Sequence, residues 1–151
     1  MNEVSVMYQS ILVAVDGSDN SRKALEVAAQ LAQGTASLTI LHVPETLTHG
    51  ATMVWGIGAV DLQTTPEEHD KIGQEVVSKA ADAARDMGVT KLDTRVERGE
   101  PARTILRQAE KLGVDAIVLG SRGLSDLSGF VFGSVSHKVT HAANCSVITV
   151  R

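Results

Sequence analysis

The sequence has little cysteine, few aromatic residues and no concentration of positive charge. Cys145 is the only cysteine, so the chain forms no internal disulfide and carries no thiolate zinc cluster. Aromatic residues make up 3% of the chain, and the formal net charge is −4 with no basic cluster. We therefore do not expect a surface that neutralises nucleic-acid phosphates or stacks on bases.

Long apolar segments are also missing. No run of about eighteen apolar residues is present, so we expect no membrane-spanning helix. The first ten residues, MNEVSVMYQS, contain an acid and lack the apolar core of a signal peptide. With 151 residues, 43% hydrophobic and 21% charged, the composition is typical of one globular domain. We expect a cytoplasmic protein whose residues 1–9 form an N-terminal extension.

Short apolar runs alternate with segments of helical periodicity. The expected strands lie at Ile11 to Val15, Leu38 to Val43, Leu92 to Val96, Ala116 to Leu119 and Val147 to Val150. The first expected helix begins after Ser18. The next two run from Pro66 to Met87 and from Pro101 to Leu112, and the last begins near Ser134. This alternation predicts an α/β fold: a single doubly wound, Rossmann-like domain with five parallel strands and helices on both faces.

Two features refine this prediction. In the strand from Leu92 to Val96, apolar and charged residues alternate, as in an edge strand with one face in water. The run from Ala116 to Leu119 is continuously apolar, which indicates a central strand. The strand order 3-2-1-4-5 satisfies both. Residues 45–65 show no periodicity, and we interpret them as a variable loop.

A glycine-rich segment, GSRGLSDLSGFVFGSVS, follows the fourth strand. It is neither a P-loop nor a G-x-G-x-x-G motif. Its glycines nevertheless allow backbone N–H groups to approach an anion, and the helix near Ser134 directs N–H groups toward it. Ser134 and Ser136 add hydroxyl groups, and Arg122 adds a positive charge. The glycine spacing alone fits a tight strand-to-helix connection equally well.

The position of this segment in the sheet favours a ligand site. Asp16 ends the first strand and Gly120 ends the fourth, so both border the crevice where the order 3-2-1-4-5 changes direction. Ligands of open α/β sheets bind in such crevices. An alternative role for Asp16 is to cap its own turn, which is common for aspartate before glycine. We interpret Ser18 as a helix cap and His42 as an interior histidine.

Four segments resemble successive blocks of the universal stress protein family: ILVAVDGSDNSRKALEVAAQLA, LTILHV, GEPARTILRQAEKLGVDAIVLGSRG and GSVSHKVTHAANCSVITV. The resemblance covers Ile11 to Arg151. Its most specific element is the pattern G-x2-G-x9-G-[S/T], which is complete here as Gly120, Gly123, Gly133 and Ser134. Family members with this pattern bind ATP, and those without it generally do not. The chain departs from the family at Cys145-Ser146-Val147, where Cys-Pro-Val is frequent.

The resemblance implies a site for ATP, ADP or AMP, with Mg²⁺ or Mn²⁺ bound through the phosphates near Asp16. The adenosine side would be lined by Ala14, Val15 and Asp16, and Val43 would meet adenine through its backbone. The phosphates would be held by Gly120, Arg122, Gly123, Gly133, Ser134, Val135 and Ser136. We expect no metal bound by protein side chains, because His137 and His141 lack an evident third ligand.

These observations predict a regulatory nucleotide-binding protein of the stress response. A slow ATPase or phosphotransferase is an alternative, although no P-loop lysine, dedicated base or pair of metal-binding acids is evident. A structural dimer module without nucleotide is another. The strand from Val147 to Val150 is apolar and carries no lysine or proline, which predicts a homodimer through this edge. Many universal stress proteins dimerise through their last strand. We also expect an unidentified protein partner.

Overall fold

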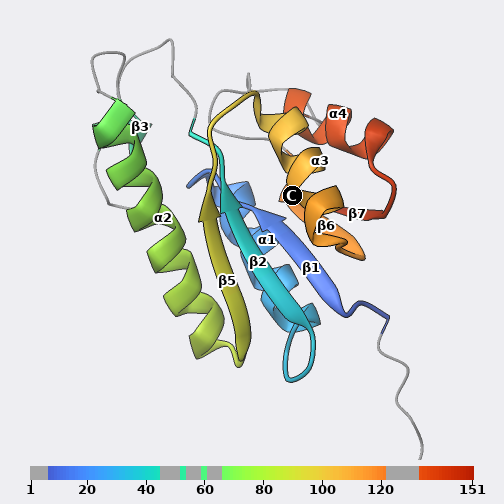
Figure 1. The fold of residues 1–151 in the computed structure, drawn as a ribbon. Coiled ribbons are helices and arrows are strands. Elements are labelled where there is room, and N and C mark those ends of the chain that lie inside the picture. Colours follow the sequence, from blue (N-terminus) through green and yellow to red (C-terminus); the bar gives the residue numbers. More distant parts are fainter. Residues whose placement is uncertain (1–6, 45–51, 54–58, 61–65, 122–132) are drawn as a thin grey trace, which may run out of the picture.

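Five parallel strands form the centre of the fold (Figure 1). The computed structural model describes residues 7–44, 52–53, 59–60, 66–121 and 133–151. The central strands are β1 (Ser10–Ala14), β2 (Ser37–His42), β5 (Lys91–Val96), β6 (Ala116–Gly120) and β7 (Ser146–Val150). Their order is β5-β2-β1-β6-β7, and every pair is parallel. The predicted order 3-2-1-4-5 is confirmed.

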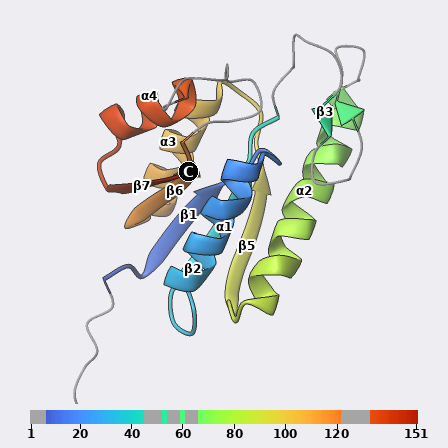
Figure 2. The same cartoon turned by 180° about the vertical axis from the view of Figure 1, so that it is seen from behind.

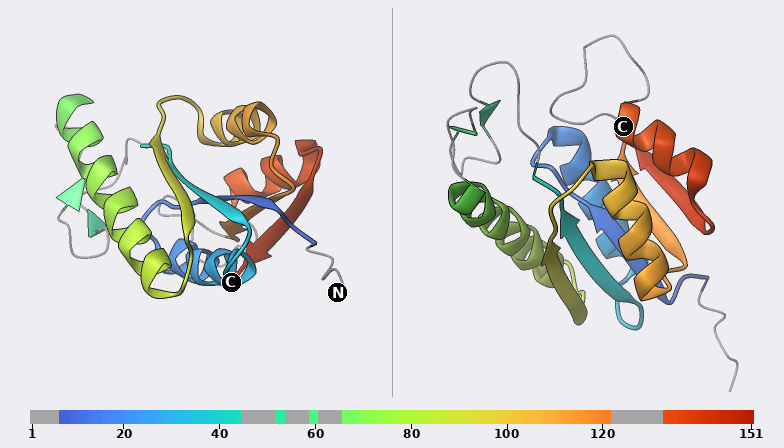
Figure 3. Two further views of the ribbon diagram at one scale, coloured as in Figure 1. Left: turned by 60° about the horizontal axis from the view of Figure 1, so that its bottom comes forward. Right: turned by 45° about the horizontal axis from the view of Figure 1, so that its top comes forward.

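Four helices cover the two faces of this sheet (Figures 1 and 2). They are α1 (Asp19–Leu31), α2 (Pro66–Asp86), α3 (Pro101–Leu112) and α4 (Ser134–Ala142). α1 and α2 share one core cluster with the sheet, whereas α3 and α4 share a second cluster on the opposite face (Figure 3). The fold is therefore the doubly wound, Rossmann-like α/β arrangement.

β1 and β6, in the middle of the sheet, are apolar from Ile11 to Ala14 and from Ala116 to Leu119 because both of their faces are covered. In β1, Ile11 and Val13 pack on the side of α1 and α2, whereas Leu12 packs on the side of α3 and α4. All three side chains are fully buried. β6 follows the same rule, with Ile117 and Val118 in opposite clusters. The continuous apolar runs in the sequence thus correspond to strands in the middle of the sheet.

The two helices that follow β1 and β5 begin with side-chain caps. Ser18 accepts a hydrogen bond from the N–H of Ser21 at 3.2 Å, which confirms its predicted role as the cap of α1. Glu100 caps α3, accepting hydrogen bonds from the N–H groups of Ala102 at 3.3 Å and Arg103 at 2.8 Å. These bonds, led by that of Arg103, lower the pKa of the Glu100 carboxyl. The sequence did not identify this cap, because glutamate is an uncommon residue there.

The structure differs from the predicted elements in two places. Helical periodicity places Leu31 with the buried alanines of α1, but Leu31 lies at the margin of that face and is 39% exposed. Residues 45–65 were expected to be a loop without strands. Within them, β3 (Thr52–Met53) and β4 (Ala59–Val60) form an antiparallel pair. Two residues per strand are too few to produce a periodic pattern. The other residues of this segment lie outside the described residues.

Among the described helices, none combines the length and apolar character needed to cross a membrane.

Candidate functional site

The candidate site lies where the ends of β1 and β6 meet. These strands are neighbours, with Val13 opposite Val118, although these two residues are 105 positions apart in the sequence. β1 connects to β2 on its other side, so the sheet changes direction at this point. Beyond β1 the extended pairing continues for one residue, because the N–H of Val15 donates to the carbonyl of Leu41 at 2.9 Å. The predicted crevice between the strand ends is therefore present in the topology.

A compact turn of residues 15–18, which we call the β1 turn, joins β1 to α1. The carboxylate of Asp16 accepts the N–H of Ser18 at 2.8 Å, and the N–H of Asp16 donates to the hydroxyl of Ser21 at 3.3 Å. The same hydroxyl donates to the carbonyl of Ser18 at 3.0 Å. Gly17 has φ of +85°, a backbone conformation that favours glycine. Asp16 thus caps its own turn, as the alternative interpretation of the sequence proposed, and this fixes its carboxylate at the end of β1.

Gly120 brings the end of β6 against the beginning of α1. A Cβ atom at this position would lie 2.8 Å from both the carbonyl carbon and the Cβ of Asn20, and 3.0 Å from the N of Ser21. Only glycine allows this approach. The first turn of α1 therefore lies directly beside the end of β6.

The end of β6 is also joined to the beginning of α4. The N–H of Gly133 donates to the carbonyl of Ser121 at 2.5 Å. The hydroxyl of Ser136 donates to the same carbonyl at 2.8 Å and accepts the N–H of Gly133 at 3.1 Å. We call these three residues, Ser121, Gly133 and Ser136, the loop clamp, because they connect the two ends of segment 122–132. Ser136 is 2% exposed, so its hydroxyl serves the loop clamp.

The remaining predicted residues differ in how they are placed. Ser134 is exposed at the first position of α4, and Val135 beside it is half-buried. Val43, after β2, is buried, and Ala14 at the end of β1 is half-buried. Two predicted phosphate contacts, Arg122 and Gly123, lie outside the described residues. The structure thus brings the β1 turn, Gly120 and the start of α4 together at one end of the sheet.

His42, at the end of β2, forms a hydrogen bond with the backbone of the β1 turn. It is 8% exposed, and its Nδ1 lies 2.7 Å from the carbonyl of Val15. Because a carbonyl only accepts hydrogen bonds, Nδ1 carries the proton. Burial lowers the pKa of His42, and the hydrogen bond to Val15 and the charge of Asp16 oppose this shift. His42 is therefore an interior histidine with its hydrogen bond satisfied, as predicted.

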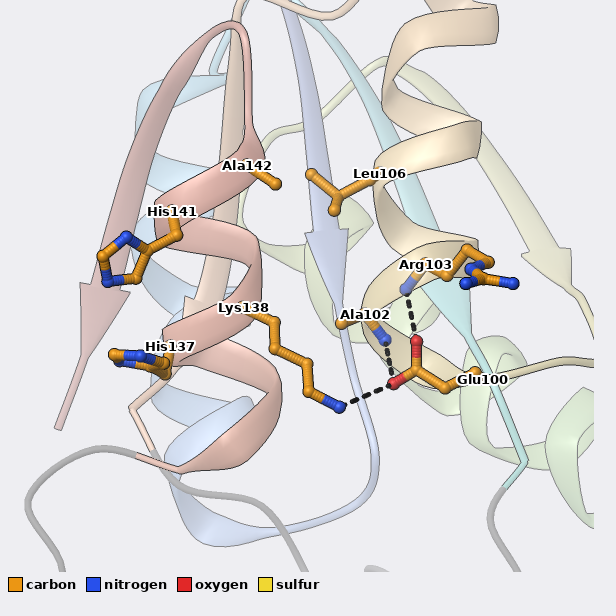
Figure 4. Close-up of a pocket in the computed structure, with 8 residues that line it drawn as sticks. All are labelled: Glu100, Ala102, Arg103, Leu106, His137, Lys138, His141 and Ala142. Carbon is orange, nitrogen blue, oxygen red and sulfur yellow. Dashed lines mark hydrogen bonds and ion pairs between the residues drawn. The ribbon is translucent and has the colours of Figure 1, made fainter.

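A second concave surface lies between α3 and α4 (Figure 4). It is a groove of about 410 Å³ with an apolar floor that includes Leu106 and Ala142. Lys138 reaches across it to Glu100 at 3.6 Å. His137 and His141, one helical turn apart on α4, pack their rings edge to face, with centroids 4.5 Å apart. In the part of the chain that the structure describes, no group of three or more metal-ligating side chains is present.

Cys145 lies outside the site. It is half-buried beside the core cluster of α3 and α4, and burial raises the pKa of its thiol.

The fold and the strand-end crevice define this chain as a Rossmann-like α/β protein. A sequence model of the universal stress protein family matches residues 7–151. The chain belongs to the universal stress protein family.

Individual relatives agree with this assignment. Universal stress protein YxiE of Bacillus subtilis is 41% identical over 149 residues, which are 96% of this chain and 100% of that protein. A putative universal stress protein of Staphylococcus haemolyticus is 35% identical, with 95% of this chain and 85% of that protein covered. Among solved structures, a universal stress protein in complex with cAMP has a TM-score of 0.70 and 26% identity, covering 95% of this chain and 97% of its own. UspA from Lactobacillus plantarum has a TM-score of 0.67 and 28% identity, covering 95% and 98%.

The contact between Gly120 and α1 predicts a loss of stability on substitution. Gly120→Ala places a Cβ within 3 Å of the Asn20 backbone, so β6 or α1 must shift. We expect the free energy of unfolding to fall by about 1–3 kcal/mol, as overpacked sites do. Gln30→Ala, on the exposed face of α1, is the control and should change stability by less than about 0.5 kcal/mol. Urea unfolding measures both; equal stability of Gly120→Ala and wild type would contradict the close approach.

The burial of His42 predicts a pH dependence of stability. The unfolded chain binds a proton at His42 near the ordinary pKa of 6.5, whereas the folded chain binds it only at lower pH. The contribution of neutral His42 to the free energy of unfolding is therefore fully present above pH 6.5 and decreases as the pH falls below that value. In His42→Asn, the amide keeps a donor for the Val15 carbonyl but does not titrate. We expect wild type to lose more stability than His42→Asn between pH 7.5 and 5.5 in urea unfolding; the same loss in both would refute the assignment.

Proposed function

We propose that this protein binds an adenine nucleotide at the crevice beyond the ends of β1 and β6. The observation that carries the proposal is the meeting of two helix N-termini at the end of one strand. Gly120 contacts the first turn of α1, and Ser121 is bonded to Gly133 at the start of α4. Helix N-termini present N–H groups and partial positive charge, which suit a phosphate group. Because Gly133 has no side chain, it leaves room for an anion at the beginning of α4.

The class of ligand follows from the relatives. A universal stress protein of 26% identity was solved in complex with cAMP, which is an adenine nucleotide. In this chain, Ala14 ends β1, Val15 and Asp16 follow it, and Val43 follows β2, the neighbour of β1 on the side opposite β6. We propose that they line the adenosine, and that the phosphates lie against Gly120, Ser134 and Val135, with Arg122 and Gly123 of the family pattern completing the site.

ATP with Mg²⁺ or Mn²⁺ is the form that we propose for the ligand. The carboxylate of Asp16 is held at the end of β1 by the N–H of Ser18 at 2.8 Å. Carboxylate and phosphate oxygens are the ligands that these hard cations prefer. The cation would be carried mainly by the phosphates, and Asp16 would orient its hydration shell.

We further propose a regulatory role for the bound nucleotide. Besides the bound divalent cation, rapid phosphoryl transfer in P-loop proteins uses a lysine at the phosphates and a residue that orients the attacking group. The sequence from Gly120 to Ser134 contains no lysine, and the carboxylate of Asp16 is engaged in its own turn. Nucleotide binding would stabilise the β1 turn and the start of α4 together, and partner proteins would recognise that state.

A homodimer through β7 completes the proposal. The N–H of Ser121 donates to the carbonyl of Val150 at 2.8 Å, so the backbone groups of alternate residues, Val147 and Thr149, point away from β6. Among the described residues, no strand pairs with that side of β7. A second copy pairing antiparallel about a two-fold axis would satisfy these groups and cover the edge.

The nucleotide proposal is tested by calorimetric titration with ATP, AMP and cAMP. Gly133→Val places a branched side chain at the start of α4, and we expect it to weaken binding at least about tenfold, or 1.4 kcal/mol. His141→Ala, on the outer surface of α4, is the control and should bind as wild type does. Equal affinity of Gly133→Val and wild type for every nucleotide, in correctly folded protein, would contradict the proposed site.

The dimer proposal is tested by light scattering after size exclusion. Thr149→Pro removes one N–H from the outer side of β7, and we expect it to convert the dimer to a monomer of 15.9 kDa. Thr149→Ala keeps the N–H and should remain dimeric. A wild-type protein that is monomeric at micromolar concentration, with or without ATP, would exclude this dimer.

A further inference from the structure

β5, the edge strand on the side of the sheet opposite β7, is not part of the proposed nucleotide site. β5 pairs with β2 from Lys91 to Val96 on one side. Within the described ranges, no strand pairs with its second side, and Figure 1 shows β5 at the end of the sheet with α2 packed against one face. A strand edge of this kind presents unpaired backbone groups that another strand can bind.

The hydrogen bonds to β2 determine which residues face this edge. The N–H of Glu97 donates to the carbonyl of His42 at 3.0 Å, so the odd-numbered residues of β5 direct their backbone groups to β2. The backbone groups of Leu92, Thr94 and Val96 therefore point to the outer edge. The N–H of Thr94 is bonded to the side chain of Asp93 at 3.0 Å, a local contact on an exposed surface. Pairing with a sixth strand would use the outer backbone groups of all three residues, and at Thr94 it would replace the contact with Asp93.

The side chains of the odd-numbered residues alternate in charge along one face. They are, in order, Lys91, Asp93, Arg95 and Glu97. Contacts with Gln108 of α3 fix this face: Arg95 lies 3.5 Å and Glu97 3.1 Å from its side-chain amide. Leu92 and Val96 pack on the opposite face, against the core cluster of α1 and α2. One face of the edge is therefore charged with alternating sign, and the other is apolar.

We propose that β5 is a homotypic docking edge, at which a second copy of this chain pairs its own β5 antiparallel about a two-fold axis through Thr94. In this register, Lys91 lies opposite Glu97 of the second copy, and Asp93 lies opposite its Arg95. Every directly opposed charge pair has opposite signs. Leu92 and Val96 oppose one another on the apolar face. The strand is thus complementary to itself.

Backbone geometry supports the same register. With Thr94 on the axis, the outward-facing residues Leu92, Thr94 and Val96 form the hydrogen-bonded pairs. The charged residues then occupy the non-hydrogen-bonded pairs, in which Cα atoms approach to about 4.5 Å and side chains are closest. Opposite charges so placed attract, and like charges repel.

The alternation also excludes the neighbouring registers. If the axis moves to Asp93, that residue opposes its own copy and Lys91 opposes Arg95, so both pairs are like-charged. If it moves to Arg95, the same conflict arises between Asp93 and Glu97. The charges therefore disfavour the two registers adjacent to the one centred on Thr94. Centring on Leu92 or Val96 also opposes opposite charges, but only the register on Thr94 pairs all four charged residues.

This edge is independent of the proposed β7 dimer. If both edges pair, each through its own two-fold axis, the sheets of successive copies become continuous and the assembly is open-ended. Lys91 and Asp93 are exposed, and Arg95 and Glu97 are half-buried. Because each proposed pair includes an exposed charge, the association should weaken as salt shortens the Debye length from about 10 Å at 0.1 M to about 3 Å at 1 M.

Charge reversal and mixing test the proposal by sedimentation velocity at low salt, in the Thr149→Pro background so that β7 does not contribute. Asp93→Arg alone opposes two arginines in each pair, and Arg95→Asp alone opposes two aspartates. We expect each variant by itself to associate at least about tenfold more weakly. An equimolar mixture restores opposite charges in both pairs, so association should return. The double variant Asp93→Arg, Arg95→Asp should also associate.

The control is Arg85→Asp on α2, which breaks an exposed ion pair with Asp82 of 3.3 Å within the chain and should leave association unchanged. Circular dichroism confirms that each variant is folded. Within one chain, Arg95 Nε lies 3.4 Å from the carboxylate of Asp93. If these two side chains act only in that intrachain ion pair, mixing produces no gain in association, and that result overturns the proposal. A Thr149→Pro chain that remains monomeric at low salt up to about millimolar concentration overturns it as well, without bearing on nucleotide affinity.

Discussion

The backbone hydrogen bond from Gly133 to Ser121 joins the end of β6 to the beginning of α4, and the candidate site depends on it. The same Ser121 donates its N–H to Val150 at the end of β7 and accepts the hydroxyl of Ser136. One residue thereby connects a central strand, an edge strand and a helix N-terminus. The close approach of Gly120 to α1 brings a second helix N-terminus to the same place. The anion-binding character that we propose follows from these backbone contacts rather than from a cluster of charged side chains.

Much of this arrangement was predictable from the sequence because burial controls it. A strand covered on both faces must be apolar throughout, which identified β6 as central, and an alternating strand identified β5 as an edge. Local chemistry was equally informative at Ser18, whose hydroxyl caps the helix that begins beside it. The order of the strands then located the crevice, and the glycine pattern was the most specific feature that indicated the universal stress protein family. The sequence model of the universal stress protein family, which matches residues 7–151, confirmed that assignment.

The parts that the sequence did not predict depend on contacts between distant residues or on very short elements. Ser136 was predicted to hold phosphate, but its hydroxyl lies in the loop clamp with Ser121, fifteen residues earlier in the chain. Gly120 was expected to hold phosphate or to shape the connection after β6, whereas its approach to Asn20 of α1 is a further reason for glycine. No local pattern encodes either contact. The β3–β4 pair was not predicted because strands of two residues show no periodicity. The exposure of Leu31 was not predicted because this residue lies at the margin of the buried face of α1.

The central claim is that an adenine nucleotide joins the β1 turn to the start of α4. Hydrogen–deuterium exchange with and without saturating ATP and Mg²⁺ tests it most directly, because it reports the affected backbone N–H groups by position. The account predicts slower exchange at residues 15–18 and 133–136, with residues 101–112 of α3 unchanged. Slower exchange confined to the α3–α4 groove, or no change at either end of the crevice when nucleotide is bound, would contradict it.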